Sequence, residues 1–422
     1  MNQPAPPGVA ARQAALRLLD AVLRRGETIE QAGGRALASI RADNDRALAR
    51  AIAAEVLRHL PDLDALIDSA TQRLLPHDAK ARFALRIALA QMLALGTPGH
   101  AAIATVLPLV DGGPRKLVHG VFGTLMRGNA SLDEFPTLPE DVEARWQNAW
   151  GEDKVAAAEQ AIAAPPPLDL TLADPAKTAA LAEAVGGVSL LPGHIRLAGA
   201  HVPELPGFEE GDWWVQDIAA SLPARLIGKG AGIALDLCSA PGGKTMQLAS
   251  AGWTVVSIDS SESRLARLRD NLARTHLAAE VVAADLLKWS PVEPADAVLL
   301  DAPCSATGIF RRHPDVLHRV NPRVIAEMAR VQAQLLVRAA KWVKPGGLLV
   351  YATCSLERAE GEEQLMAFLG AQPDFAIDPV RAGELPAGIT PHQRGWVRTL
   401  PGMLGSEGGC DGFFIARLKR AA

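Results

Sequence analysis

The chain has 422 residues, of which 49% are hydrophobic and 21% charged, and this ordinary globular composition excludes a largely disordered protein. The formal net charge of −4 hides a basic N-terminal part, because residues 1–130 hold 16 Lys and Arg against 11 Asp and Glu. This local excess of positive charge favours a polyanionic partner for the N-terminal part.

Residues 9–130 are predicted to form a compact all-α bundle, because apolar residues recur there at helical spacing and the linkers are short. Val9 begins the first apolar repeat, and Gly26 ends it. The expected helices are 9–25, 46–60, 62–75, 80–95, 101–110 and 114–127. Next comes a polar helical stretch with Trp146 and Trp150, which the prolines 165–167 end.

A small α+β segment is expected next, with short strands at 168–172 and 188–191 around one helix. From residue 232 onward strands and helices alternate, which predicts a Rossmann-like, doubly wound parallel sheet. The expected strands are 233–237, 254–258, 281–283, 297–300 and 348–352, and the expected helices are 244–250, 262–274 and 322–343. We therefore expect a multidomain chain with boundaries at 1–132, 133–228 and 229–422.

The four cysteines are Cys238, Cys304, Cys354 and Cys410, and their wide spacing excludes a paired zinc motif. They are also too few for a disulfide scaffold in a chain of this size. The sequence lacks an apolar run of about 20 residues and an N-terminal signal core, so no membrane span is expected. We expect a cytoplasmic protein that binds no metal and keeps its thiols reduced.

The first strand of the sheet runs into a turn of small residues, Cys238-Ser239-Ala240-Pro241-Gly242-Gly243-Lys244-Thr245. Such a turn lets a ligand approach the backbone closely. A phosphate-binding Walker loop would need Gly where Cys238 stands, and the dinucleotide fingerprint fails because Gly242 and Gly243 are adjacent. The turn at 238–244 therefore suits a nucleoside that carries no phosphate.

Three acids follow successive strands, and together they predict a negatively charged rim. Asp259 stands 17 residues after Gly242 and can accept hydrogen bonds from ribose hydroxyls. Asp285 is placed to face an adenine amino group, and Asp301 ends the fourth strand. Each acid alone would more often be a surface or capping residue. In strand order they favour a sulfonium cofactor with an amino acid tail, namely S-adenosylmethionine.

Cys304 and Cys354 each follow a strand of the same sheet and precede a serine. A single buried Cys is usually inert packing, but these two stand where parallel sheets place functional groups. A thiolate that adds to carbon 6 of cytosine makes carbon 5 nucleophilic toward a methyl sulfonium. Asp301 is the candidate acid at ring nitrogen 3, and the second cysteine can assist release. These residues alone leave open which cysteine attacks.

These motifs resemble the RNA 5-methylcytosine methyltransferases of the Nop2/Sun type. They are most similar to the bacterial ribosomal RNA small-subunit methyltransferase B (Sun/Fmu) family. The matching segments are CSAPGGKT at 238–245, SIDSS at 257–261, AADLL at 283–287, DAPCSATG at 301–308, RRHPD at 311–315 and YATCS at 351–355. The helical N-terminal part resembles the NusB-like RNA-binding domain of this family.

The resemblance implies that Cys354 attacks the base and that Cys304 assists product release. It implies that S-adenosylmethionine binds to the turn 238–244 and to Asp259, Asp285 and Asp301. The implied substrate is a cytosine in 16S ribosomal RNA, either free or in a small-subunit assembly intermediate. We expect the enzyme to be a monomer.

Four arginines are candidate RNA contacts, which would position phosphates without reading sequence. Arg311 and Arg312 follow the Cys304 turn closely in sequence, and Arg17 and Arg24 lie on the first predicted helix. For any one of them, a solvated helix face is the simpler interpretation.

Two other functions compete with the RNA methyltransferase. One is a helical RNA-binding adaptor whose catalytic half is only a scaffold, and retention of both cysteines and three strand-end acids argues against it. The other is a methyltransferase for small molecules or proteins, which the basic N-terminal part and the two cysteines disfavour.

Overall fold

The computed structural model describes residues 8–163 and 165–422, which form two compact units. The first unit extends to Pro165 and also contains the segment Phe310–Asn321. The second unit consists of Pro166–Ile309 and Pro322–Ala422. The chain thus leaves the second unit after Ile309 and returns to it at Pro322. The three-domain division expected from the sequence stays a prediction.

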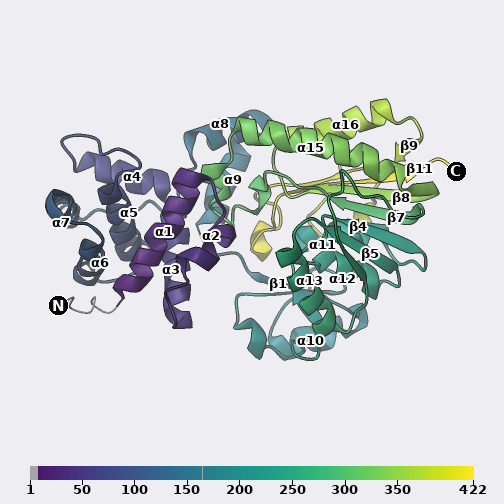
Figure 1. The fold of residues 1–422 in the computed structure, drawn as a ribbon, viewed down its shortest axis with the longest axis horizontal. Coiled ribbons are helices and arrows are strands. Elements are labelled where there is room, and N and C mark those ends of the chain that lie inside the picture. Colours follow the sequence, from purple (N-terminus) through teal and green to yellow (C-terminus); the bar gives the residue numbers. More distant parts are fainter. Residues whose placement is uncertain (1–7, 164) are drawn as a thin grey trace. The chain divides into compact units, whose positions relative to one another are not determined.

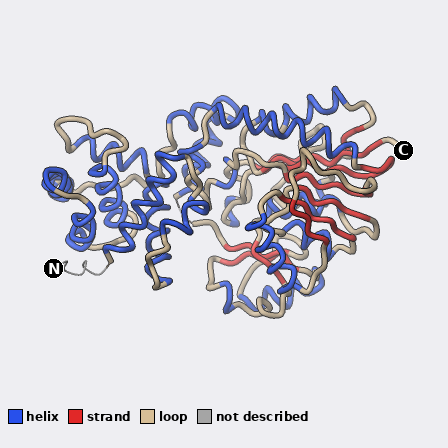
Figure 2. The backbone as a smooth tube through the Cα atoms, viewed as in Figure 1, coloured by secondary structure: helices blue, strands red, loops and turns tan. Residues whose placement is uncertain are grey.

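Helices make up all the regular structure that is described in the first unit, which confirms the predicted all-α bundle (Figure 2). They are α1 (Val9–Arg25), α2 (Ile29–Ala36), α3 (Asp43–Arg58), α4 (Leu60–Ser69), α5 (Lys80–Leu93), α6 (Gly99–Val106), α7 (Gly112–Arg127), α8 (Glu140–Trp150), α9 (Glu152–Ile162) and α14 (Val316–Arg319). Helix α2 was not predicted. A capping box begins it, in which the Thr28 side chain accepts from the Gln31 backbone and the Gln31 side chain accepts from the Thr28 backbone.

The segment Phe310–Asn321 packs among the helices of the first unit, although its neighbours in sequence belong to the second. The Phe310 ring lies 5.3 Å from the Trp146 ring, measured between centroids. His318 Nε2 lies 2.6 Å from the carbonyl oxygen of Leu57 at the end of α3. Arg58 of the same helix donates to the carbonyl oxygen of Arg311 at 3.1 Å. The helical unit therefore includes a short piece of the sequence that lies between β7 and β8.

A small antiparallel sheet opens the second unit, with β1 (Leu168–Leu172) between β2 (His194–Leu197) and β3 (Trp213–Val215). The strand expected at 188–191 is wrong, because the strand that pairs with β1 begins at His194. Gly193 turns the chain with φ 77°, and Val188 makes only an isolated bridge to Arg196. The mostly apolar residues 188–191 thus precede the turn at Gly193, and the strand β2 follows that turn.

The main sheet of the second unit has eight strands in the order β10-β11-β8-β7-β4-β5-β6, with β9 beside β11 (Figure 1). They are β4 (Ile233–Leu237), β5 (Thr254–Asp259), β6 (Glu280–Ala283), β7 (Ala295–Asp301), β8 (Val343–Thr353), β9 (Phe375–Ile377), β10 (Val397–Thr399) and β11 (Phe413–Arg420). The five neighbouring strands β8, β7, β4, β5 and β6 are parallel. The strands β9, β10 and β11 join them antiparallel. The predicted Rossmann-like fold is confirmed, and its order switches direction between β4 and β7.

Helices cover both faces of this sheet. They are α11 (Ile218–Ile227), α12 (Gly243–Ser250), α13 (Glu262–Thr275), α15 (Pro322–Lys341) and α16 (Glu362–Ala371), whereas α10 (Thr178–Val185) packs against the small sheet. Alternate residues of a strand point to opposite faces, so Leu300 of β7 packs with α15 while Leu299 packs with α11. None of the helices in the described part of the chain is long and apolar enough to cross a bilayer.

Candidate active site

The carboxyl ends of the parallel strands meet at one edge of the main sheet, where a cavity of about 380 Å³ opens. Six residues singled out from the sequence line it together: Cys238, Asp259, Asp285, Asp301, Cys304 and Cys354. They come from the ends of five strands, β4 to β8, and lie beside the switch between β4 and β7. Open α/β sheets bind their ligands at such a switch point. The volume lies within the roughly 300–1,000 Å³ typical of ligand pockets.

The turn after β4 brings backbone close to this cavity. Cys238 adopts the left-handed conformation with φ 62°, and Gly242 has φ 106°. A Cβ at Gly242 would come within 2.8 Å of Leu268 Cγ, so this position has room only for glycine. Helix α12 begins at Gly243, directly after the turn. Gly242 thus lets the turn pack closely against α13, and the approach of a ligand to the turn backbone stays a prediction.

Asp259 anchors the turn from the end of β5. Its Oδ2 accepts from the Ala240 backbone N–H at 3.2 Å, and its Oδ1 accepts from the Ser261 N–H at 2.9 Å. Arg264 approaches Asp259 Oδ2 at 3.4 Å. Each carboxylate oxygen has a second lone pair, so Asp259 can still accept from a ligand. Its predicted ribose contact stays a prediction, as does the adenine contact of the exposed Asp285.

Asp301 forms a partly buried ion pair with Lys244. Lys244 Nζ lies 2.8 Å from Asp301 Oδ2. Burial works to lower the pKa of Lys244, but the charges of Asp301 and Asp236 outweigh it and hold that pKa above its usual value. Lys244 therefore carries its proton at neutral pH, and Asp301 faces an ammonium group.

Asp236, in the middle of β4, is a buried acid that the sequence reasoning missed. Thr245 Oγ1 donates to its Oδ2 at 2.6 Å. Burial raises the pKa of Asp236 to about 7, and the neighbouring carboxylates Asp301 and Asp259 add to this effect. A single acid inside the apolar run Ile233–Leu237 was the signal that could have revealed it.

The sulfur atoms of Cys304 and Cys354 lie 3.5 Å apart, at the ends of the neighbouring strands β7 and β8. The hydrogen bond to Cys354 and burial raise the pKa of Cys304 well above its usual value. Cys304 therefore keeps its proton at neutral pH, and either sulfur of the pair can be the donor in this contact. Burial and nearby carboxylates also raise the pKa of Cys238.

The candidate RNA contacts do not lie in the same unit as the cysteines. Arg17 and Arg24 are exposed on α1 of the first unit, where Arg24 pairs with Asp20 at 3.0 Å. Arg311 is buried and Arg312 half-buried, and both belong to the segment that packs with the helices. Closeness in sequence to Cys304 therefore does not place these two arginines in the catalytic unit. RNA contact by all four stays a prediction.

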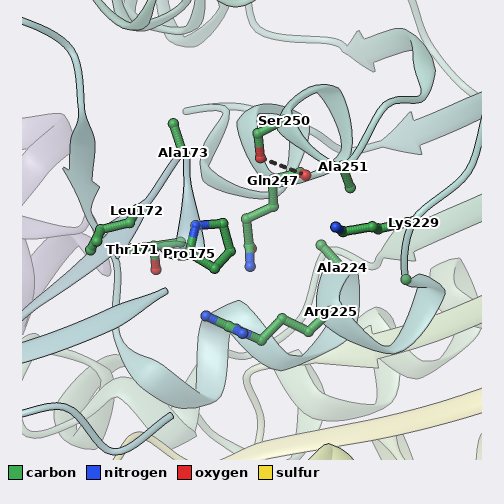
Figure 3. A pocket seen from close by; sticks show the side chains of 11 residues that line it. Thr171, Leu172, Ala173, Pro175, Ala224, Arg225, Lys229, Gln247, Ser250 and Ala251 are labelled. Atoms are coloured by element: carbon green, nitrogen blue, oxygen red, sulfur yellow. Dashed lines mark hydrogen bonds between the residues drawn. The ribbon is translucent and has the colours of Figure 1, made fainter. Parts of the chain in front are cut away.

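A second cavity, of about 190 Å³, lies among β1, α11 and α12 and differs in chemistry (Figure 3). Figure 3 shows the side chains of Arg225, Lys229 and Gln247 among those that surround it. Burial lowers the pKa of Arg225 to about 10. The residues that line this cavity include neither an acid nor a cysteine. It therefore suits a sulfonium nucleoside less well than the cavity at the strand ends.

The described residues contain no group of three or more His, Cys, Asp or Glu side chains that could hold a metal ion. The first cavity is lined by the thiols Cys304 and Cys354 and by Asp301, which pairs with Lys244. Two thiols and an ion pair at one strand edge are groups that covalent catalysis on a planar ring can use.

Sequence comparisons match both halves of the chain. A family model described as 16S rRNA methyltransferase RsmB/F matches residues 226–419, and the NusB family model matches residues 9–124. The ribosomal RNA small subunit methyltransferase B of Xylella fastidiosa is 35% identical over 97% of this chain and 98% of its own length. The protein of that name from Xanthomonas campestris is 35% identical over 98% of each chain.

Solved structures share the fold. The crystal structure of PH0851 matches with a TM-score of 0.75 at 21% identity and covers 100% of both chains. The structure of NSun6 from Pyrococcus horikoshii matches with a TM-score of 0.59 at 18% identity, over 68% of this chain and 99% of its own.

The raised pKa of Asp236 predicts how stability depends on pH. Between the ordinary Asp pKa of 3.8 and about 7 the unfolded chain loses this proton while the folded protein keeps it, so the free energy of unfolding falls as pH rises. Asp236→Asn should therefore gain on the wild type as pH rises, with a stability difference at pH 8 that is roughly 2–3 kcal/mol more favourable to the variant than at pH 5. Thermal unfolding at both pH values measures this, with the exposed Asp270→Asn as control. Parallel pH profiles for wild type and Asp236→Asn would contradict it.

Proposed function

Because the chain belongs to the ribosomal RNA small subunit methyltransferase B family, we propose that it transfers a methyl group from S-adenosylmethionine to carbon 5 of a cytosine in 16S ribosomal RNA. The observation that carries this proposal is the pair of thiols 3.5 Å apart on the cavity at the strand ends. Methylation of an amino group needs no thiol, whereas carbon 5 of cytosine must first be activated by a nucleophile at carbon 6.

Cys354 is the proposed nucleophile, because the charges around the two thiols differ. Cys354 lies close enough to Lys244 to be among the causes of the raised pKa of Lys244. A cationic neighbour is the setting in which nucleophilic cysteines are found. The Glu360 carboxylate instead contributes to the raised pKa of Cys304. In this proposal a bond forms between Cys354 Sγ and carbon 6, and carbon 5 then takes the methyl group. Water in the cavity, acting as the base, takes the carbon 5 proton, and the bond to Cys354 Sγ breaks with its electrons on the sulfur.

Cys304 is the proposed partner in release. Its sulfur lies 3.5 Å from the sulfur that must leave the ring. A thiol in that position can donate to the departing Cys354 sulfur and stabilise the negative charge that develops on it.

Asp301 and Lys244 act in this proposal as one acid for the ring. The raised pKa of Lys244 keeps its ammonium group protonated, so Lys244 is the proton donor of the pair. Asp301 Oδ2 is occupied by Lys244, which leaves Oδ1 as the acceptor toward the base. The sequence assigned the acid to Asp301 alone, and the ion pair refines this assignment by adding Lys244.

The cavity fits S-adenosylmethionine, whose sulfonium cation is complementary to the acids at the strand ends. When bound, this cofactor supplies an electrophilic methyl group. The turn 238–244 approaches it through backbone, and Asp259 holds that turn while keeping a lone pair for the ribose. Ser239 Oγ is buried and without a partner among the described residues, so the turn also has a polar group to offer.

The helical unit is proposed to bind the ribosomal RNA, either free or in an assembly intermediate of the small subunit. Its match to the NusB family and the exposed Arg17 and Arg24 on α1 support this role. Arg312 is half-buried in the same unit and is a further candidate.

Replacing each cysteine tests the covalent step. Cys354→Ala should reduce methyl transfer to background, because no nucleophile remains at carbon 6. Cys304→Ala should accumulate a covalent protein–RNA adduct on a denaturing gel, because release is impaired. Cys410→Ala, which changes a buried packing cysteine, is the matched control and should form no lasting adduct. An adduct that accumulates in Cys354→Ala instead would reverse the two roles.

Replacing Asp259 tests the cofactor site. Asp259→Ala should weaken binding of S-adenosylmethionine roughly tenfold or more, because a hydrogen bond to a charged group contributes about 1.5–3 kcal/mol. Isothermal calorimetry measures the dissociation constant, and the exposed Asp270→Ala on α13 is the control. Unchanged affinity in a folded Asp259→Ala protein would remove Asp259 from the cofactor site.

A further inference from the structure

The turn that carries Cys304 and the turn that carries Cys354 both donate hydrogen bonds to one buried carboxylate, that of Glu360. Ser305 follows Cys304, Ser355 follows Cys354, and both hydroxyl groups donate to Glu360 Oε2. The Ser305 backbone N–H also donates to Glu360 Oε1 at 2.9 Å. All three residues are buried, and Glu360 is fully inaccessible. Glu360 therefore bridges two loops that leave the sheet from different strands.

A glutamine completes this bridge. Gln332 Nε2, from α15, donates to Glu360 Oε1 at 3.0 Å and to the carbonyl oxygen of Pro303 at 2.9 Å. Glu360 thus accepts from four donors, which is the number that the two oxygens of an ionised carboxylate can take. Among the described residues no ion pair is found for Glu360. Its charge is therefore held by hydrogen bonds alone, which makes their geometry specific.

The backbone of Glu360 is held as well. Its carbonyl oxygen accepts from Tyr351 Oη at 2.7 Å and from Thr353 Oγ1 at 3.3 Å, and both side chains belong to β8. The residue is thereby fixed relative to the strand that leads to Cys354. Because the Glu360 carboxylate also accepts from Ser305, the turn that follows β7 is held in place relative to β8.

We propose that Glu360 is a positioning residue for the thiol pair, because its buried carboxylate ties the turn that carries Cys304 to the turn that carries Cys354. The catalytic consequence rests on the proposed function, in which one sulfur attacks the ring and the other assists its release. Glu360 touches neither the base nor the cofactor in this account. It acts through the two serines and sets the distance between the two sulfur atoms.

The charge of Glu360 has a second effect on the pair. After the hydrogen bond to Cys354 and burial, this carboxylate is among the causes that raise the pKa of Cys304. Glu360 thus positions both thiols and favours the protonated form of Cys304, the thiol that donates in the proposed function. A residue that only filled space in the core would do neither.

The test measures the positions of the thiols directly, without RNA or cofactor. In glutathione buffers, oxidised glutathione converts the two thiols into a disulfide and two molecules of reduced glutathione. The equilibrium, read by alkylation and mass spectrometry, gives the effective concentration of one thiol at the other. The variants are Glu360→Ala, which removes every acceptor, and Glu360→Gln, which keeps the size of the side chain. The exposed Glu363→Ala, three residues further on, is the matched control.

Glu360→Ala should lower this effective concentration about tenfold or more, Glu360→Gln should lie between, and Glu363→Ala should equal the wild type. In Glu360→Ala, kcat should also fall on the order of a hundredfold with the KM for RNA unchanged, because misplacement of a reacting group by about 1 Å costs this much. A folded Glu360→Ala protein with the wild-type disulfide equilibrium would overturn the proposal. So would a wild-type protein whose two thiols form no disulfide.

If Glu360→Ala does not fold, Ser305→Ala carries the same test, because it removes one hydroxyl from the bridge and no charge. A lowered effective concentration in Ser305→Ala supports the proposal, and an unchanged one overturns it. Failure of the proposed function would appear instead in the adduct experiment, since the disulfide equilibrium does not depend on which sulfur attacks.

Discussion

The contact between the Cys304 and Cys354 sulfur atoms, at 3.5 Å, is the constraint on which the catalytic half depends. It exists because β7 and β8 are parallel neighbours whose register sets Asp301 opposite Ala352, so both turns leave the sheet at the same level. Two reactive groups that belong to one reaction must stay within contact distance while a ring enters beside them. The register of β7 and β8 brings the two turns to the same edge of the sheet, and hydrogen bonds to Glu360 link the two turns.

Electrostatics then makes two similar thiols different. The Glu360 carboxylate contributes to the raised pKa of Cys304, whereas Cys354 interacts with the Lys244 ammonium. Burial and then the carboxylates at the strand ends raise the pKa of Cys238, the third cysteine on the cavity. The same acids suit a sulfonium cation. In the proposed function, one arrangement of charge therefore serves the nucleophile and the methyl donor together.

Much of this could be predicted from sequence where a local pattern carries the signal. The alternation of strands and helices indicated the sheet, and residues at strand ends such as Asp259 and Cys354 indicated its functional edge. Contacts between distant segments have no such pattern. The packing of Phe310 with Trp146, the pairing of Lys244 with Asp301 and the bridge by Glu360 all depend on tertiary contacts. The strand expected at 188–191 was wrong for a related reason, because apolar residues alone do not say which run pairs with β1.

The central claim is that this thiol pair methylates carbon 5 of a cytosine in small-subunit ribosomal RNA. Bisulfite sequencing of 16S ribosomal RNA, after incubation with the protein and S-adenosylmethionine, tests it most directly because a methyl group at carbon 5 protects cytosine from deamination. The account predicts a protected cytosine with the wild type and none in a parallel reaction without protein. Methyl groups incorporated into the RNA without any protected cytosine would contradict it.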